Sequence, residues 1–196
     1  MRAYRGPIFR DDKNGGYGSR FLLSFIRYHH LMMNYQAILA TPFAMLGIRC
    51  NADALLGIDF LPVNVGPQEA GNTFARKVCA QLREYVRHPD AVFDVPLALH
   101  GTPHQLKVWR ALMAIPRGET RHYGELAAEL HSAAQAVGQA CGANPIPIII
   151  PCHRVVSKTG LGGFMRHADG VSLDIKRWLL DHEHPSTSSE RTVICE

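Results

Sequence analysis

The sequence predicts an α/β (α+β) fold, with a small N-terminal antiparallel sheet and helix followed by a mainly helical domain that contains a helix-turn-helix. Three observations carry this prediction. Short apolar segments separated by turn-forming residues precede residue 62, and apolar residues recur at helical spacing after residue 72. In the second half, two helical segments are joined by a tight turn.

The N-terminal part is predicted to form three strands and one helix. Residues 34–40, 44–50 and 54–60 are the strands of an antiparallel meander, because turn formers separate them. A helix is predicted over about 73–87, where the apolar spacing is helical, and His88-Pro89 ends it.

The second half begins with two predicted helices. Thr102 and Pro103 supply a cap and a first helical residue, and this helix ends near residue 114. The segment "YGELAAEL", residues 123–130, is a short amphipathic helix.

Three further elements complete the predicted order. A helix opened by a capping Ser132 runs to Asn144, where it ends. The apolar run Ile148-Ile149-Ile150 is predicted to be a buried strand, and a final helix covers about 172–183.

Composition places the chain among ordinary globular proteins. Of its 196 residues, 46% are hydrophobic and 19% charged, and no stretch approaches the roughly 20 apolar residues of a membrane span. The formal charge of +4 is compatible with a polyanionic partner, but on charge alone solvated basic side chains are the better explanation. Five cysteines, an odd number without a C-x-x-C pair, indicate a reducing compartment and no zinc site. We therefore predict no metal.

The chain is predicted to divide into four parts. Residues 1–32 are a weakly ordered extension or the product of a start codon placed too far upstream, and 185–196 are a disordered tail. Between them lie an N-terminal domain, 33–95, and a second domain, 96–184.

Cys152 has the neighbours of a reactive cysteine. Free cysteines are usually small core residues, but Cys152 follows Pro151 and precedes His153 and Arg154, so a base and a positive charge adjoin the thiol. In a regular strand residues 152 and 153 would face opposite ways. His153 can therefore serve Cys152 only if the backbone bends or a water bridges them.

The helix after His131 has unusual side chains, because residues 132–142 include no charged residue and almost nothing larger than valine. Such a helix can be buried on most sides. Alternatively, its outer face lies flat against another surface, such as the narrow minor groove of DNA.

These motifs together resemble a known family. "PCHRVV" preceded by "GANPIPIII", with "GTPHQLKVWRALMAIPRGETRHYGELA" upstream and "KRWLLDHE" downstream, is similar to the 6-O-alkylguanine-DNA alkyltransferases. The resemblance covers about residues 100–183, and more loosely 33–99. It implies single-turnover repair of alkylated guanine, and possible repair of 4-O-alkylthymine, in double-stranded DNA. It also implies a cytoplasmic monomer, nuclear in a eukaryote, that needs no cofactor.

The resemblance also implies roles for individual residues. Cys152 would accept the alkyl group, Glu183 would polarise His153, and His153 would take the thiol proton through a water. Tyr123 would hydrogen-bond the flipped base, and Asn144 would join the recognition helix to the active site. Backbone carbonyls of Val155 and Cys152 would meet the exocyclic amine of the base. The DNA-binding residues would be Ala134, Gln135, Ala136, Gly138, His104 and Arg154.

Three features depart from the family pattern. Gln135 stands where an arginine usually replaces the flipped base, and His104 stands where phenylalanine is common. The segment 163–174 is longer than usual, so the pocket contacts it makes cannot be assigned from the sequence.

Three other functions compete with repair by alkyl transfer. A lesion-binding protein of the alkyltransferase-like kind would lack the acceptor cysteine, which is present, although Gln135 leaves this alternative open. A cysteine hydrolase would not explain the charge-free helix. A transcription regulator should carry long polar side chains on its recognition helix.

Overall fold

The computed structural model describes residues 35–165 and 170–184. The predictions for residues 1–32 and 185–196, and for part of the 163–174 segment, therefore lie outside the described residues.

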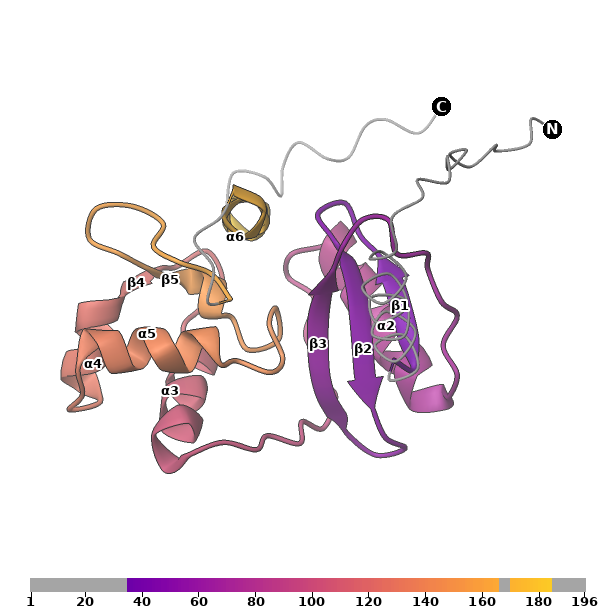
Figure 1. The fold of residues 1–196 in the computed structure, drawn as a ribbon, viewed down its shortest axis with the longest axis horizontal. Helices are drawn as coiled ribbons and strands as arrows, with labels where there is room; N and C mark the ends of the chain where they lie inside the picture. Colours follow the sequence, from indigo (N-terminus) through magenta and orange to yellow (C-terminus); the bar gives the residue numbers. More distant parts are fainter. Residues whose placement is uncertain (1–34, 166–169, 185–196) are drawn as a thin grey trace, which may run out of the picture. The chain divides into compact units, whose positions relative to one another are not determined.

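The N-terminal elements form a three-stranded antiparallel sheet covered by a helix. Strands β1 (Ala37–Ala40), β2 (Met45–Cys50) and β3 (Leu55–Leu61) pair in the order β1-β2-β3, as Figure 1 shows. Helix α2 (Thr73–Arg87) begins at Asn72, whose side chain accepts a hydrogen bond from the amide of Ala75, and it packs against β1 and β2. The predicted strands and helix are confirmed, with strand boundaries displaced by one to three residues.

Helix α3 (Pro103–Met113) begins at the predicted cap. The Thr102 side chain accepts a hydrogen bond from the amide of Gln105, and the Gln105 side chain accepts one from the amide of Thr102. Both backbone amides at the start of the helix therefore have a partner. Trp109 is buried and donates its indole N–H to the carbonyl of Ala140 at 2.9 Å, which fixes α3 against the next helical pair.

Helices α4 (Tyr123–Glu129) and α5 (Ala134–Gly142) form the predicted helix-turn-helix. The turn passes through His131, which has a left-handed φ of 51°. The prediction that Ser132 caps α5 is wrong, because α5 begins two residues later without a side-chain cap. The Ser132 hydroxyl instead lies 2.8 Å from Nε2 of His104.

Of the remaining elements, the final helix was predicted, whereas two short strands and a 3-10 turn were not. Residues Arg121–His122 (β4) and Val155–Val156 (β5) form a two-residue parallel ladder, and α6 spans Gly170–Glu183. Between α5 and β5 lies a single 3-10 turn, η1 (Cys152–Arg154). The predicted α/β class is therefore confirmed.

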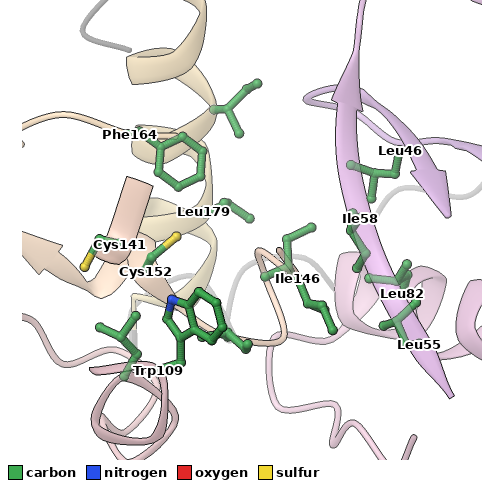
Figure 2. Close-up of a cluster of buried hydrophobic side chains, with 14 of the residues drawn as sticks. Leu46, Leu55, Ile58, Leu82, Trp109, Cys141, Ile146, Cys152, Phe164 and Leu179 are labelled. Atoms are coloured by element: carbon green, nitrogen blue, oxygen red, sulfur yellow. The ribbon is translucent and has the colours of Figure 1, made fainter. Parts of the chain in front are cut away.

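A continuous hydrophobic core joins the sheet, α2 and the helices of the second half (Figure 2). Leu46 and Ile58 extend into it from the sheet, and Trp109, Ile146 and Leu179 from the later elements. The division into domains at residue 95 stays a prediction. No helix within the described residues is long and apolar enough to cross a membrane.

Candidate active site

The segment before Cys152 is a buried loop, so the prediction of a strand over 148–150 is wrong. Pro145, Pro147 and Pro151 have no amide hydrogen, and a ladder cannot form through them. Ile148 has a φ of 76°, which no regular strand contains. The loop is nevertheless buried and specifically held.

Asn144 holds this loop from within. Its side-chain Nδ2 donates to the carbonyl of Ile150 at 2.8 Å, and its Oδ1 accepts from the amide of Ile146 at 3.0 Å. The amide of Ile58 in β3 donates to the carbonyl of Pro145 at 3.0 Å. The side chain of Asn144, which follows α5, therefore bridges two points of the loop that leads to Cys152.

Cys152 begins the 3-10 turn η1, so the backbone bends where the thiol is presented. The amide of Cys152 donates to the carbonyl of Ile150 at 2.8 Å, and the amide of Arg154 donates to that of Pro151 at 3.0 Å. Residues 152 and 153 are consequently not on opposite faces of a strand. Both side chains are buried.

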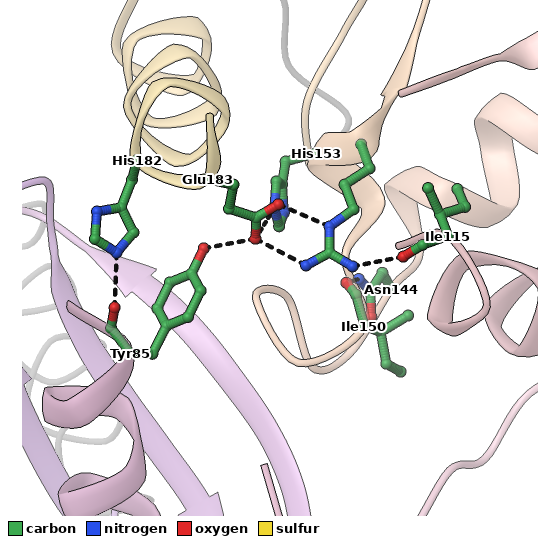
Figure 3. Close-up of polar contacts among 8 residues, drawn as sticks. Tyr85, Ile115, Asn144, Ile150, His153, His182 and Glu183 are labelled. Carbon is green, nitrogen blue, oxygen red and sulfur yellow. Dashed lines mark hydrogen bonds and ion pairs between the residues drawn. The ribbon is translucent and has the colours of Figure 1, made fainter. Parts of the chain in front are cut away.

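Glu183, at the end of α6, is contacted by three polar side chains from two other elements (Figure 3). Its Oε1 lies 3.0 Å from His153 Nε2 and accepts from the hydroxyl of Tyr85, on α2, at 2.8 Å. Arg154 donates from Nε and Nη2 to the two carboxylate oxygens at 2.8 and 2.9 Å. The carboxylate is thus held in one orientation.

The guanidinium of Arg154 is engaged within the protein, and its expected contact with DNA stays a prediction. Its guanidinium is bound by Glu183 and by the carbonyl of Ile115, 2.6 Å from Nη1, and its side chain is 14% exposed. A bidentate pair of this kind is strong and leaves little of the guanidinium for another anion. The structure therefore assigns Arg154 to the Glu183 network.

The protonation states follow from burial and these contacts. Burial would raise the pKa of Glu183, but hydrogen bonds from His153 and Arg154 hold it well below its ordinary value. Burial lowers the pKa of His153 against the pull of Glu183. Burial raises the pKa of the Cys152 thiol to about 11, despite a hydrogen bond from Asn144 and the charge of Lys176. At neutral pH the site therefore holds a thiol, a neutral imidazole and a carboxylate.

His153 has a nitrogen available on the side away from Glu183. Its Nδ1 is buried and has no hydrogen-bond partner within residues 35–165 and 170–184. With a proton on Nε2, Nδ1 is a base, and a carboxylate behind it stabilises the imidazolium that protonation produces.

A cavity of about 330 Å³ opens beside the thiol. Tyr123 lies at its edge, with its hydroxyl 3.3 Å from the carbonyl of Gly163, and burial raises the pKa of that phenol. Residues of α5 and of the segment before α6 complete the lining: Ala134, Gly138, Cys141, Gly142, Cys152, Gly163, Phe164 and Met165. The thiol therefore faces a small, mainly apolar chamber.

The outer part of α5 borders a second and more open hollow. His104 and Gln105 line it from α3, and Gln135, Ala136 and Gly138 from α5. Gln135 is exposed. The predicted DNA-binding residues other than Arg154 thus gather along the small-residue helix, next to the cavity that holds the thiol.

Lys176 was missed by reasoning from the sequence. Its ammonium is buried and donates to the carbonyls of Val155, Leu161 and Gly163 at 2.7, 2.6 and 3.1 Å. The carbonyl of Val155, expected to meet a base, thus already accepts one hydrogen bond. Burial lowers the pKa of Lys176 to about 8. A signal was present, because Lys176 and Glu183 are charged residues seven apart on a stripe with Leu179.

Three comparisons relate this chain to known proteins. The family model described as "6-O-methylguanine DNA methyltransferase, DNA binding domain" matches residues 103–185. A probable methylated-DNA–protein-cysteine methyltransferase of Acanthamoeba polyphaga mimivirus is 45% identical over 109 residues, which cover 54% of this chain and 70% of that protein. The Salmonella typhimurium methylated-DNA–protein-cysteine methyltransferase is 50% identical over 107 residues, which cover 53% of this chain and 60% of that protein.

The fold is also similar to a solved structure. The Mycobacterium tuberculosis protein OGT, in complex with DNA, superimposes with a TM-score of 0.64 at 37% identity. The match covers 74% of this chain and 90% of that one.

Proposed function

Because the chain belongs to the 6-O-methylguanine DNA methyltransferase family, we propose that it repairs DNA by transferring the alkyl group of 6-O-alkylguanine to Cys152. The observation that carries this assignment is a buried thiol facing a cavity, with His153 and Glu183 behind it. A thiolate is the nucleophile that such a transfer requires.

The proton of the thiol must be removed as the bond to carbon forms. With a pKa of about 11, Cys152 is protonated at neutral pH, so a base is needed. His153 Nδ1 takes the proton through a bridging water, and Glu183 stabilises the resulting imidazolium. The sulfur–carbon bond then forms while the bond from that carbon to O6 breaks.

The leaving guanine must be neutralised. The hydroxyl of Tyr123 hydrogen-bonds the base, and guanine departs as a neutral species by gaining one proton, which balances the thiol proton taken by His153. The carbonyls of Cys152 and Val155 accept from the exocyclic amine, which holds the base in register. 4-O-alkylthymine is a second substrate of the same chemistry.

The target base reaches the thiol by leaving the duplex, because an alkyl group on O6 is inaccessible in the base stack. Helix α5 lies in the minor groove, where Ala134, Ala136 and Gly138 permit close approach and Gln135 fills the gap left by the base. His104 contributes from the start of α3. Binding rests on phosphate contacts and weakens as salt increases.

The protein acts once per molecule. A thioether on Cys152 resists hydrolysis, so the alkyl group stays on the protein. It acts as a monomer on double-stranded DNA in the cytoplasm, or in the nucleus of a eukaryote.

Intact-mass spectrometry tests the transfer directly. The protein is incubated with a duplex that contains one 6-O-methylguanine, beside a Cys152→Ala control. We expect a gain of about 14 Da, one methylene, in the wild type alone and limited to one event per protein. A mass change in the control would place the acceptor elsewhere.

The competing function is lesion binding without transfer. It draws support from Gln135, which brings no charge to the position usually held by an arginine. Under this alternative the protein binds the lesion duplex but its mass does not change. That outcome would refute transfer and retain recognition of the damaged base.

A further inference from the structure

Tyr85 connects the sheet-side helix α2 to the carboxylate behind the acceptor. Its hydroxyl donates to Glu183 Oε1 at 2.8 Å, although the two residues are 98 positions apart, and both side chains are buried. We propose that Tyr85 is a positioning residue for alkyl transfer, which keeps Glu183 oriented and His153 neutral and able to accept a proton. This inference rests on the proposed function and deepens it.

Tyr85 is held at two points by successive residues of α6. Nε2 of His182 lies 2.7 Å from the carbonyl of Tyr85, while Glu183 takes the hydroxyl (Figure 3). The ring of Tyr85 also packs edge-on against His182 and, at a centroid distance of 5.6 Å, against Phe93. With its backbone and both ring neighbours fixed, the hydroxyl is aimed at Glu183 without freedom to rotate away.

The bond falls on the oxygen that matters for His153. Oε1 of Glu183 meets Tyr85, His153 and Nη2 of Arg154, whereas the bond from Nε of Arg154 goes to Oε2. Each donor to Oε1 disperses its negative charge and weakens its attraction for a positive imidazole. The hydroxyl therefore makes a second proton on Nδ1 of His153 less favourable, while Oε1 still accepts from Nε2.

Tyr85 differs from the charged groups around His153, because it is a neutral donor to Oε1 that comes from a separate element, α2. Arg154 belongs to the same turn as His153, and Lys176 and Glu183 belong to α6. The buried residues of α3 itself are apolar. Lys176 and Arg154 repel a positive imidazole, and Tyr85 is the neutral donor that moderates the one carboxylate.

Tyr85→Phe removes the hydroxyl and keeps the ring contacts. The matched control is Tyr35→Phe, because Tyr35 is also a buried tyrosine of the N-terminal half whose hydroxyl bonds to a carboxylate, that of Asp59. Three measurements are made on each protein: a ¹⁵N-histidine NMR titration of His153, the single-turnover transfer rate between pH 5 and 9, and lesion-duplex affinity in a Cys152→Ala background. His153→Gln identifies the resonance.

In Tyr85→Phe we expect the midpoint of the His153 NMR titration to rise by about half a pH unit or more. The pH at which the transfer rate falls on the acid side should rise by the same amount. For a rise of half a unit, transfer at pH 6.5 should fall by up to about twofold, with duplex affinity within about twofold of wild type. Tyr35→Phe should match the wild type in all three. Incorporation of 3-fluorotyrosine at position 85, a stronger donor, should move the midpoint in the opposite direction.

An unchanged His153 midpoint and acid limb in Tyr85→Phe would overturn the proposal. Equal effects in Tyr35→Phe would do so as well, since they would indicate a general loss of packing. Should the wild type transfer no alkyl group, the proposed function fails in the rate measurement, while the NMR titration still decides whether Tyr85 controls His153.

Discussion

At the scale of single residues, Lys176 shows how one buried charge can shape a pocket. An ammonium group has three donors, and the carbonyls of Val155, Leu161 and Gly163 receive one each. Gly163 also accepts from the hydroxyl of Tyr123, so the lysine and the tyrosine share an anchor. The charge of Lys176 in addition lowers the pKa of Cys152 against the effect of burial.

We therefore expect Lys176→Met to impair the acceptor in two ways. The three carbonyls lose their donor, which should lower the free energy of unfolding by about 1–3 kcal/mol. The pKa of Cys152 should rise further, because the positive charge is gone, and the rate of transfer should fall about tenfold or more. Thiolate absorbance against pH measures the pKa of Cys152, and single-turnover transfer measures the rate.

The neighbouring Arg177→Met is the matched control for Lys176. Arg177 pairs with Asp174 on the exposed side of α6. Exposed pairs contribute little to stability, so this variant should behave as wild type. A Lys176→Met protein that kept the wild-type thiol titration would contradict the electrostatic role.

At the scale of elements, α5 combines two requirements in one short helix. Its inner face is buried through Val137, Ala140 and Cys141, while Ala134 and Gly138 line the cavity. Glycine within a helix costs about 0.5–1 kcal/mol relative to alanine. A side chain at position 138 would approach the ring of Tyr123, so the space above that ring is the feature that glycine preserves.

Gly138→Ala should separate the stability of α5 from the size of the cavity. A Cβ at this position would meet Tyr123 at 3.9 Å, an ordinary van der Waals contact, so the variant should fold and gain about 0.5–1 kcal/mol. The narrower cavity should slow transfer of a benzyl group more than of a methyl group. Competing duplexes carrying each lesion, scored by intact mass, measure the ratio.

Gly124→Ala on α4 is the control for this change, because a Cβ there meets nothing within 4 Å. It should leave the benzyl-to-methyl ratio at the wild-type value. An equal change of the ratio in both variants would show that the effect comes from the helical pair as a whole.

Local signals explain which elements could be predicted. The caps at Thr102 and the end of α2 at His88 are encoded by neighbouring residues, and both helices were placed well. The apolar run before Cys152 has the composition of a strand, but its prolines and the side chain of Asn144 hold it as a loop. Composition alone could not reveal this.

In the candidate site, too, residues marked by a local motif could be predicted, and residues brought in by tertiary packing could not. Cys152 and His153 are adjacent in the chain, and a local motif was enough to single them out. Tyr85 and Lys176 reach the site through tertiary packing over 98 and 21 positions, to Glu183 and to Val155. The stripe of Lys176, Leu179 and Glu183 marks the lysine, but no local pattern names the carbonyls it meets or the carboxylate that Tyr85 meets. The ladder of β4 with β5 escaped prediction for the same reason.

At the scale of the whole molecule, the hydrogen-bond network of Tyr85, His153, Arg154 and Glu183 also connects the N-terminal elements to the elements around Cys152. Tyr85 brings α2 to Glu183, and the ring of Phe60 on β3 packs 5.6 Å from that of Phe164 beside the cavity. The buried groups of this network include a neutral imidazole and an ionised carboxylate, and protonating either costs more free energy in the folded chain than in the unfolded one. Stability of the fold should therefore depend on pH.

The sign of this dependence is the same for both groups. The pKa of His153 is lowered by burial, so the unfolded chain binds a proton below about pH 6.5 while the folded chain resists it. The pKa of Glu183 is also low in the folded state, so the unfolded chain takes that proton first below about pH 4.5. The free energy of unfolding should consequently fall as pH decreases from 6.5, and fall faster below 4.5.

His153→Gln should remove the first part of this decline. One proton bound by the unfolded chain alone corresponds to a slope of about 1.4 kcal/mol per pH unit, which urea denaturation at pH 7, 6 and 5 can resolve. His100→Gln, at an exposed histidine, is the matched control and should keep the wild-type slope. If the free energy of unfolding fell equally with pH in the wild type and in His153→Gln, the buried imidazole would not be the group responsible for the decline.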